Sequence, residues 1–253
     1  MDIHKPKPWH GLREFLKEYV IIVVGVLTAL GAEQAVEWLH WRHLAVEAER
    51  DLAAGVRPDL VNAYHIVVIE SCGRARVAAL SAALLKPGSD WRASPMPESA
   101  QARATYVMPR VYVNIGRVWS HAAWDAALGS GVLNHMPKDR VVRYGELYRL
   151  VDNLASMLRT ESVAITHLAP LAYDRKLTEP EKAHYLEMVG EFDATTANAT
   201  ASARVILRDA HALGLDLTPG EAQQVLKRQH EARGDCVTDV KLPLERPAYL
   251  GGS

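Results

Sequence analysis

The chain has 253 residues, of which 49% are hydrophobic and 23% are charged, and its formal net charge is −1. This length and composition are sufficient for one substantial hydrophobic core. The chain lacks the clustered basic excess that is typical of nucleic-acid-binding domains, so we expect no nucleic acid among its partners.

An uncharged run from Tyr19 to Ala32 is the first element along the chain. It follows the basic segment HKPKPWHGLREFLKE and continues without a helix-breaking residue into EQAVEWLHWRH. The run alone is shorter than the roughly 20 residues that a helix needs to cross the hydrocarbon core of a bilayer. Its flanks must therefore decide whether it spans a membrane.

Both flanks extend the apolar run. Phe15 and Leu16 lengthen it on the N-terminal side, while Trp38 and Trp41 lie where a belt of interfacial aromatic residues is expected. The sequence therefore predicts a retained transmembrane anchor over residues 19–41, with the lipid bilayer as its partner. The anchor residues that we single out are Tyr19, Ile22, Val24, Gly25, Leu27, Ala29, Leu30, Trp38 and Trp41.

Two alternatives to a retained anchor remain open. A basic segment, an apolar run and the small residues Ala29, Gly31 and Ala32 follow the order of a cleaved signal peptide. Against cleavage, Glu14 and Glu18 are unusual before a signal core, and no loop-forming residue follows the cleavage point. The run could also be a core helix of a soluble protein, but a helix that is apolar on all sides needs deep burial or lipid.

The distribution of Lys and Arg predicts the orientation of the anchor. More basic residues lie close to its N-terminal end than to its C-terminal end, and the more basic flank usually stays in the cytoplasm. We therefore expect a single-pass protein with residues 1–18 in the cytoplasm and residues 42–253 across the membrane, which is the periplasm if the membrane is the inner membrane of a Gram-negative bacterium. The residues compared are Lys5, Lys7, Arg13 and Lys17 before the anchor, and Arg42, Arg50 and Arg57 after it.

Polar and small residues in the anchor suggest contacts with other helices. Glu33 and Gln34 lie near its outer boundary, where ionisable groups can mark a helix partner, although a solvated carboxylate is the simpler interpretation. Gly25 and Ala29 form a small-xxx-small pair that lets two helices approach closely. A homo-oligomer or a membrane protein complex is therefore a candidate assembly.

The chain has two cysteines, Cys72 and Cys236, without the CxxC spacing of a zinc site. In an oxidising compartment we expect one disulfide between them. Such a bond would close a loop of roughly 160 residues and contribute about 4–5 kcal/mol in the chain-entropy model. In the cytosol both residues would be small buried side chains.

The segment after the anchor continues as an amphipathic helix from Ala35 to Val56. Pro58 is expected to kink this helix or to begin a new one over Pro58–Leu85. Residues 86–100 are rich in Pro and Ser and predict a loop. A period-two pattern over residues 105–116 indicates one extended segment.

Helices are predicted for most of the remaining chain. Trp119–Leu128 is expected to be a short helix, and Pro137 to open a long helix that reaches about His167. Two capping boxes follow, at Thr178 and at Thr218, each with a proline in the first helical turn and a glutamate at the third helical position. The fold class expected from these elements is all-α, a transmembrane helix that continues into a helical bundle.

No catalytic motif was found. His40 and His43 are three residues apart, but the sequence has no HExxH and no acidic partner at ligand spacing. Ser120-His121 lacks a GxSxG elbow. We therefore predict no catalytic, cofactor-binding or metal-binding residues and no cofactor.

The order of VIIVVGVLTALGAEQ, WLHWRH and WDAALGSGVLNHMPKDRVVRYGELYRLVDNL resembles an uncharacterised family of bacterial single-pass membrane proteins. These have a short basic N-terminus, one transmembrane helix and a helical soluble domain. The resemblance covers residues 1–60 and 119–154, and it implies an architecture without any activity.

The function expected from these features is a membrane-anchored helical interaction or scaffold module, or an accessory subunit of a bacterial envelope complex. An extracytoplasmic enzyme or small-ligand sensor is the alternative. Its pocket would lie near Trp119, Trp124, Tyr144 and Tyr148, although such aromatic residues more often fill a core.

Overall fold

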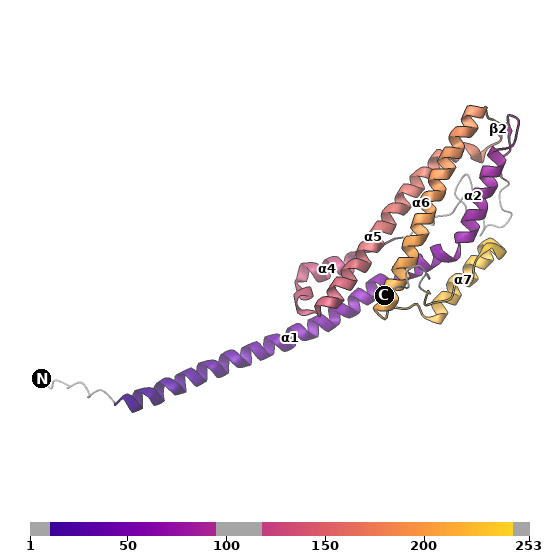
Figure 1. Ribbon diagram of the computed structural model, residues 1–253. Coiled ribbons are helices and arrows are strands. Elements are labelled where there is room, and N and C mark those ends of the chain that lie inside the picture. The colour runs from indigo at the N-terminus through magenta and orange to yellow at the C-terminus, as the bar shows by residue number, and fades with distance from the viewer. Residues whose placement is uncertain (1–10, 95–117, 245–253) are drawn as a thin grey trace, which may run out of the picture.

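A computed structural model describes residues 11–94 and 118–244. Six α-helices account for most of this part of the chain, and the prediction of an all-α fold is confirmed (Figure 1). The extended segment expected at 105–116 and the first ten residues lie outside the described ranges.

Helix α1 (Leu12–Val68) is a single helix of 57 residues, which corresponds to a rod about 85 Å long at 1.5 Å per residue. It includes Pro58, so the prediction of a new helix over Pro58–Leu85 is wrong. A proline inside a helix costs roughly 3 kcal/mol. The buried side chains of Val56 and Leu60 on either side of it offset this cost by packing in the core.

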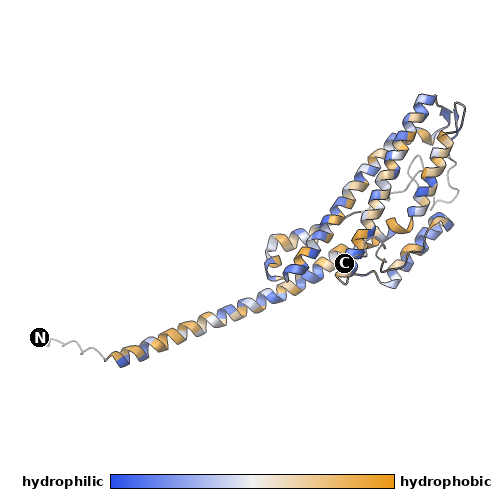
Figure 2. Ribbon diagram, viewed as in Figure 1, coloured by the Kyte–Doolittle hydropathy of each residue, from blue (hydrophilic) through white to orange (hydrophobic). Residues whose placement is uncertain are grey.

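The two halves of α1 differ in their surroundings. The N-terminal half protrudes from the rest of the molecule, and apolar residues predominate along it (Figures 1 and 2). From Ala45 onward α1 contributes buried residues to the core, and from Asn62 to Val68 every residue is buried. One helix thus forms both the protrusion and part of the bundle.

The bundle is built around α5 (Lys138–His167) and α6 (Glu179–Ala212), which lie side by side (Figure 1). Helix α2 (Glu70–Leu84) packs on α6, and the end of α1 packs on α6 and on α7 (Pro219–Arg233). Helix α4 (Ala122–Ser130) and the short 3-10 helix η1 (Val132–His135) pack on α1 where it enters the bundle. The largest fully buried side chains are Tyr64, Tyr144, Tyr148 and Phe192.

Short elements connect the helices. Strands β1 (Asp90–Trp91) and β2 (Arg175–Lys176) pair antiparallel at the end of the bundle remote from the protrusion. The 3-10 helix η2 (Ala169–Ala172) precedes β2, and η3 (Gly234–Cys236) follows α7. The indole Nε1 of Trp91 donates to the carbonyl of Leu171 at 2.9 Å, which fastens β1 to η2.

Several predicted helix boundaries are confirmed. Thr178 and Thr218 each form the complete capping box, with the hydroxyl and the glutamate bonded reciprocally to backbone amides. Pro137 immediately precedes α5, which ends at His167. The short helix expected from Trp119 begins three residues later, at Ala122.

Candidate functional site: the anchor helix and its attachment to the bundle

The protruding half of α1 exposes large apolar side chains over its full length. Leu27, for example, is 63% exposed. By length and composition α1 could cross a membrane, and none of the residues in its most apolar 18-residue window is buried. The predicted anchor residues lie here, and Glu33 and Gln34 are exposed on the same stretch. A core helix of a soluble protein would instead be buried, whereas the described residues leave this surface uncovered.

Aromatic and basic side chains surround the point where α1 reaches the bundle. Trp41 stacks on His135 of η1 with ring centroids 4.0 Å apart and planes 8° from parallel. One turn earlier, Trp38 lies beneath the guanidinium of Arg42, whose Cζ is 5.3 Å from the ring centroid. The η1 segment therefore contacts the helix at the end of the predicted anchor.

Two ion pairs fasten the buried half of α1 to other helices. Glu49 accepts hydrogen bonds from the guanidinium of Arg140 on α5. Arg57 forms a two-point contact with the carboxylate of Glu221, at 2.7 Å and 2.5 Å. The hydrogen bond from Arg57 is the main reason that the pKa of Glu221 falls to about 2.

The C-terminal segment fastens the end of α1. The backbone amide of Thr238 donates to the carbonyl of Val68 at 2.9 Å, where the helix ends. The hydroxyl of Tyr64 donates to the carbonyl of Val240 at 2.7 Å. Both contacts join residues more than 160 positions apart in the chain, since 238 − 68 = 170 and 240 − 64 = 176.

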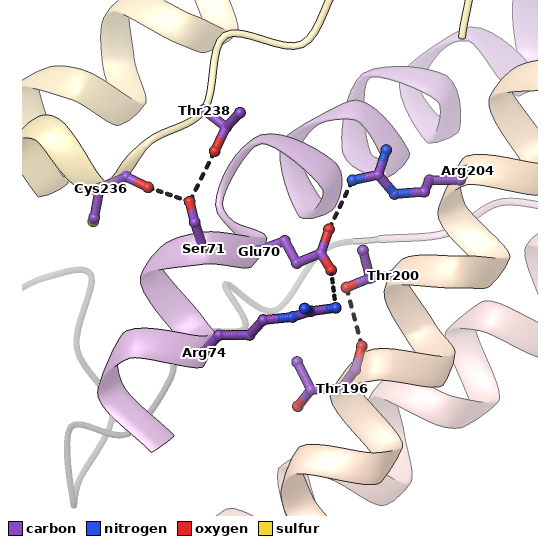
Figure 3. Close-up of polar contacts among 8 residues, drawn as sticks. All are labelled: Glu70, Ser71, Arg74, Thr196, Thr200, Arg204, Cys236 and Thr238. Carbon is purple, nitrogen blue, oxygen red and sulfur yellow. Dashed lines mark hydrogen bonds and ion pairs between the residues drawn. The ribbon is translucent and has the colours of Figure 1, made fainter. Parts of the chain in front are cut away.

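A disulfide strengthens the same attachment. Cys72 and Cys236 are bonded, with their Cα atoms 4.9 Å apart, as the sequence predicted for an oxidising compartment. Next to it, the hydroxyl of Ser71 donates to the carbonyl of Cys236 and contacts the hydroxyl of Thr238 at 2.9 Å (Figure 3). We refer to residues 236–240, together with their contacts to α1 and α2, as the tail clamp.

A charged network lies beside the tail clamp. The carboxylate of Glu70 lies between two guanidinium groups, at 2.5 Å from Arg74 and at 2.7 Å from Arg204 of α6 (Figure 3). This network joins the start of α2 to α6. The bend between α1 and α2 is thus held by a covalent bond on one side and by ion pairs on the other.

Buried ionisable residues are the features that the sequence analysis missed. Asp59 and His65 of α1 are buried; the ring nitrogens of His65 have no hydrogen-bond partner among the described residues, and the carboxylate of Asp59 lies near the backbone of Ser120. Burial raises the pKa of Asp59 to about 7, and the nearby backbone of Ser120 only partly opposes this. Burial also raises the pKa of Glu161 on α5 to about 7, although Thr196 donates to it at 2.7 Å.

Helical spacing contained a signal for two of these residues. Glu161 continues the apolar stripe formed by Leu154 and Leu158, and Asp59 follows Val56 by three positions. An acid within an apolar stripe is expected either to pair or to remain protonated. The spacing could therefore have identified both acids as buried.

The aromatic residues of the predicted ligand pocket pack together. Tyr144 and Tyr148 are fully buried, and the hydroxyl of Tyr148 donates to the carbonyl of Leu52 at 2.8 Å. Trp124 stacks on Tyr148 and lies so close to Gly145 that a Cβ there would be 3.1 Å from its ring. Trp119 packs against the core. Tyr144 and Tyr148 therefore fill the interior of the bundle, and the partly buried Trp119 and Trp124 pack against it.

The geometry does not support nucleophilic catalysis at Ser120-His121 or a metal site near His43. The hydroxyl of Ser120 accepts from the amide of Ala122 at 3.4 Å, and His121 lies 4.0 Å from Asp152. His43 faces Glu47 at 3.2 Å. Within residues 11–94 and 118–244, no three His, Cys, Asp or Glu side chains are grouped so that they could hold a metal ion.

No protein-family model, curated protein or solved structure matches the chain. The functional interpretation therefore depends on the geometry of the chain itself.

Proposed function

We propose that the protein is a membrane-anchored helical interaction module that acts as a scaffold or accessory subunit of a bacterial envelope complex. The anchor would be residues 19–41, with residues 1–18 in the cytoplasm and the helical domain from residue 42 onward in the periplasm. The resemblance to bacterial single-pass proteins and the excess of Lys and Arg before the anchor support this assignment.

One observation carries the proposal: α1 is exposed and apolar in its first half and forms part of the core in its second half. From Leu12 to His40 the rod is about 43 Å long at 1.5 Å per residue, which is close to the roughly 40–45 Å of a bilayer with its headgroups. A flexible linker would let the domain move independently of the anchor. A continuous helix instead holds the domain at a fixed distance and angle from the membrane.

The disulfide supports a periplasmic location for the helical domain. Disulfides persist in oxidising environments such as the periplasm and are rare in the cytosol. The Cys72–Cys236 bond closes most of the proposed periplasmic domain, with a sequence separation of 164. An oxidising compartment for the domain agrees with the orientation that the distribution of Lys and Arg predicts.

Membrane fractionation of cells that express the full chain tests the anchor. We expect the protein in the membrane fraction after a carbonate wash, with both thiols labelled only after reduction. Val24→Arg with Leu27→Arg should reduce insertion, because an arginine at the centre of a span costs about 2.5–3.5 kcal/mol. Val142→Arg with Val163→Arg, at exposed positions of α5, is the matched control. Recovery of the wild type in the soluble fraction would contradict the proposal.

Photo-crosslinking tests the interaction role. A photoreactive residue at position 33 or 34 should capture a neighbouring helix in the membrane, since Glu33 and Gln34 are exposed and uncovered by the bundle. Mass spectrometry of the crosslinked product then distinguishes a second copy of the chain from another membrane protein. If neither position gives a crosslinked product, and the protein purifies from mild detergent as a monomer without a partner, the scaffold role is contradicted.

A further inference from the structure

We propose that the groove between α1 and the start of α5 binds the phosphate headgroup of an anionic phospholipid. The inference rests on the proposed membrane anchor and adds a lipid-binding site to it. The groove has a volume of about 340 Å³, which is within the range of about 300–1,000 Å³ that is usual for small-molecule sites. It is lined by Trp38, Trp41, Arg42, Ala45, Val46, Glu49, His135 and Pro137.

The charge of the groove favours an anion. Arg42 stacks on Trp38 and has no acidic partner among the described residues, so its guanidinium N–H groups remain available. Among the described residues that line the groove, Glu49 is the only acid, and Arg140 already neutralises it. A planar guanidinium with free donors is well suited to a phosphate, which it can bind through two parallel hydrogen bonds.

The start of α5 adds to this preference. Pro137 lines the groove and precedes α5, and it has no side-chain oxygen to cap the first amides of that 30-residue helix. The N-terminal end of a helix carries a partial positive charge and favours anions. Asp139 in the first turn of α5 partly offsets this charge, so Arg42 supplies the main attraction for an anion and the helix end adds to it.

The position along α1 identifies a lipid as the source of the phosphate. The apolar run is centred near Gly25, and Arg42 lies about 25 Å further along the helix at 1.5 Å per residue. The phosphates lie about 20 Å from the bilayer centre, because the full thickness is roughly 40–45 Å. Helical side chains point toward the N-terminus, so the guanidinium over Trp38 reaches back to about this level.

The walls of the groove fit a lipid at the membrane surface. Trp41 and His135 stack face to face and form one side, and tryptophan is typical of the interface between lipid and water. Helix α4 lies on the side of the bundle from which α1 protrudes (Figure 1), and its residue Leu128 is 61% exposed. The domain would thus rest on the leaflet beside its own anchor.

Native mass spectrometry of the full-length protein in detergent, with phosphatidylglycerol and phosphatidylcholine added in equal amounts, tests the site. We expect the wild type to retain phosphatidylglycerol in preference to phosphatidylcholine. Arg42→Ala should lower this preference about tenfold, the equivalent of one charge-assisted hydrogen-bonding group. Arg42→Lys keeps the charge but loses the planar stack, so an intermediate loss is expected. Arg50→Ala, an exposed arginine two turns further along α1, should leave the preference unchanged.

The outcomes separate this inference from the anchor itself. Equal retention of the two lipids by the wild type, or an unchanged preference in Arg42→Ala, overturns the lipid site while the protein still inserts into phosphatidylcholine vesicles. Displacement of the lipid by glycerol phosphate at comparable concentration would overturn the choice of a lipid and indicate a soluble phosphate. Failure to insert into vesicles of either composition would overturn the anchor. Circular dichroism of each variant verifies that it is folded.

Discussion

The two halves of α1 belong to one helix but have different surroundings. Leu27 in the first half is 63% exposed, whereas Leu52 in the second half is fully buried. Both halves have helical backbone, and no break separates them. Helix formation and burial are therefore separate properties here: the apolar surface of the second half is covered by the bundle, and that of the first half is left for another environment.

The halves also differ in how they are attached. The buried half is fastened by ion pairs from Glu49 and Arg57 and by the tail clamp at Val68. Among the described residues, the exposed stretch from Tyr19 to His40 forms no ion pair with another element. Variants in the second half should consequently change the stability of the fold, and variants in the first half should change its interaction with lipid.

Removal of the disulfide is expected to have the largest effect. The bond holds the C-terminal segment against the end of α1, and its loop of 164 residues corresponds to at most about 5 kcal/mol in the chain-entropy model. Cys72→Ala with Cys236→Ala should lower the free energy of unfolding by about 2–5 kcal/mol, measured by urea denaturation in detergent. Insertion into vesicles should be unaffected. A loss of insertion with no loss of stability would contradict the conclusion that the buried half of α1 determines stability and the exposed half determines insertion.

Equivalent leucine truncations in the two halves test the comparison directly. Leu52→Ala should cost about 2–5 kcal/mol of unfolding free energy, because it leaves a cavity in the core. Leu27→Ala, which removes the same atoms from an exposed position, should remain within about 0.5 kcal/mol. Denaturation of both variants in the same detergent provides the measurement. Similar costs for the two would mean that the exposed half packs against something in the folded state.

The sequence predicted those parts of this architecture that depend on local signals. The apolar run, the two capping boxes and Pro137 each act through residues within one or two helical turns. The run is helical as predicted, and the capping boxes and Pro137 mark the starts of α6, α7 and α5. The end of α1 could not be found in this way. Pro58 was the strongest local breaker, yet the helix ends at Val68, where Thr238 caps its last carbonyl. That contact comes from the other end of the chain.

The candidate site also contains features that the sequence predicted and features that it did not. The pairing of Cys72 with Cys236 could be predicted, because the chain contains only two cysteines. The stack of Trp41 on His135 and the pairing of Glu49 with Arg140 join residues about 90 positions apart, and no periodicity in the sequence reports them. The groove between α1 and α5 therefore became visible only in three dimensions.

The buried acids predict a dependence of stability on pH. Burial raises the pKa of Asp59 and of Glu161 to about 7 in the folded state, from 3.8 and 4.5. The folded state therefore holds these protons more tightly, so its stability falls as the pH rises from about 4 through 7 and then levels off. Glu161 should account for at most about 3 kcal/mol of this fall, because one pKa unit corresponds to 1.36 kcal/mol.

Denaturation curves at a series of pH values, for the wild type and for Asp59→Asn with Glu161→Gln, measure this effect. The double variant should lose most of the decline, since neither amide ionises. In the Glu161→Gln side chain, the amide oxygen can still accept the hydrogen bond that Thr196 donates to the carboxyl group. An equally steep decline in the double variant would show that other groups cause it.

The ion pair between Arg57 and Glu221 should have the smallest effect. Its side chains are 37% and 29% exposed, so a coupling of about 0.5–1 kcal/mol is expected for a partly solvated pair. Because the pKa of Glu221 is lowered to about 2, this contribution is present above about pH 4.5 and is lost as the pH falls toward 2.

A double-mutant cycle of Arg57→Ala and Glu221→Gln isolates the pair, since Glu221 also caps α7 through Thr218 and its single variant reports both roles. Arg50→Ala is the control on the same helix. A coupling near zero at neutral pH would mean that α7 is held to α1 by apolar contacts alone. A coupling above the expected range would mean that solvent screens the pair less than its exposure suggests, and that the buried half of α1 is fixed by charge as well as by packing.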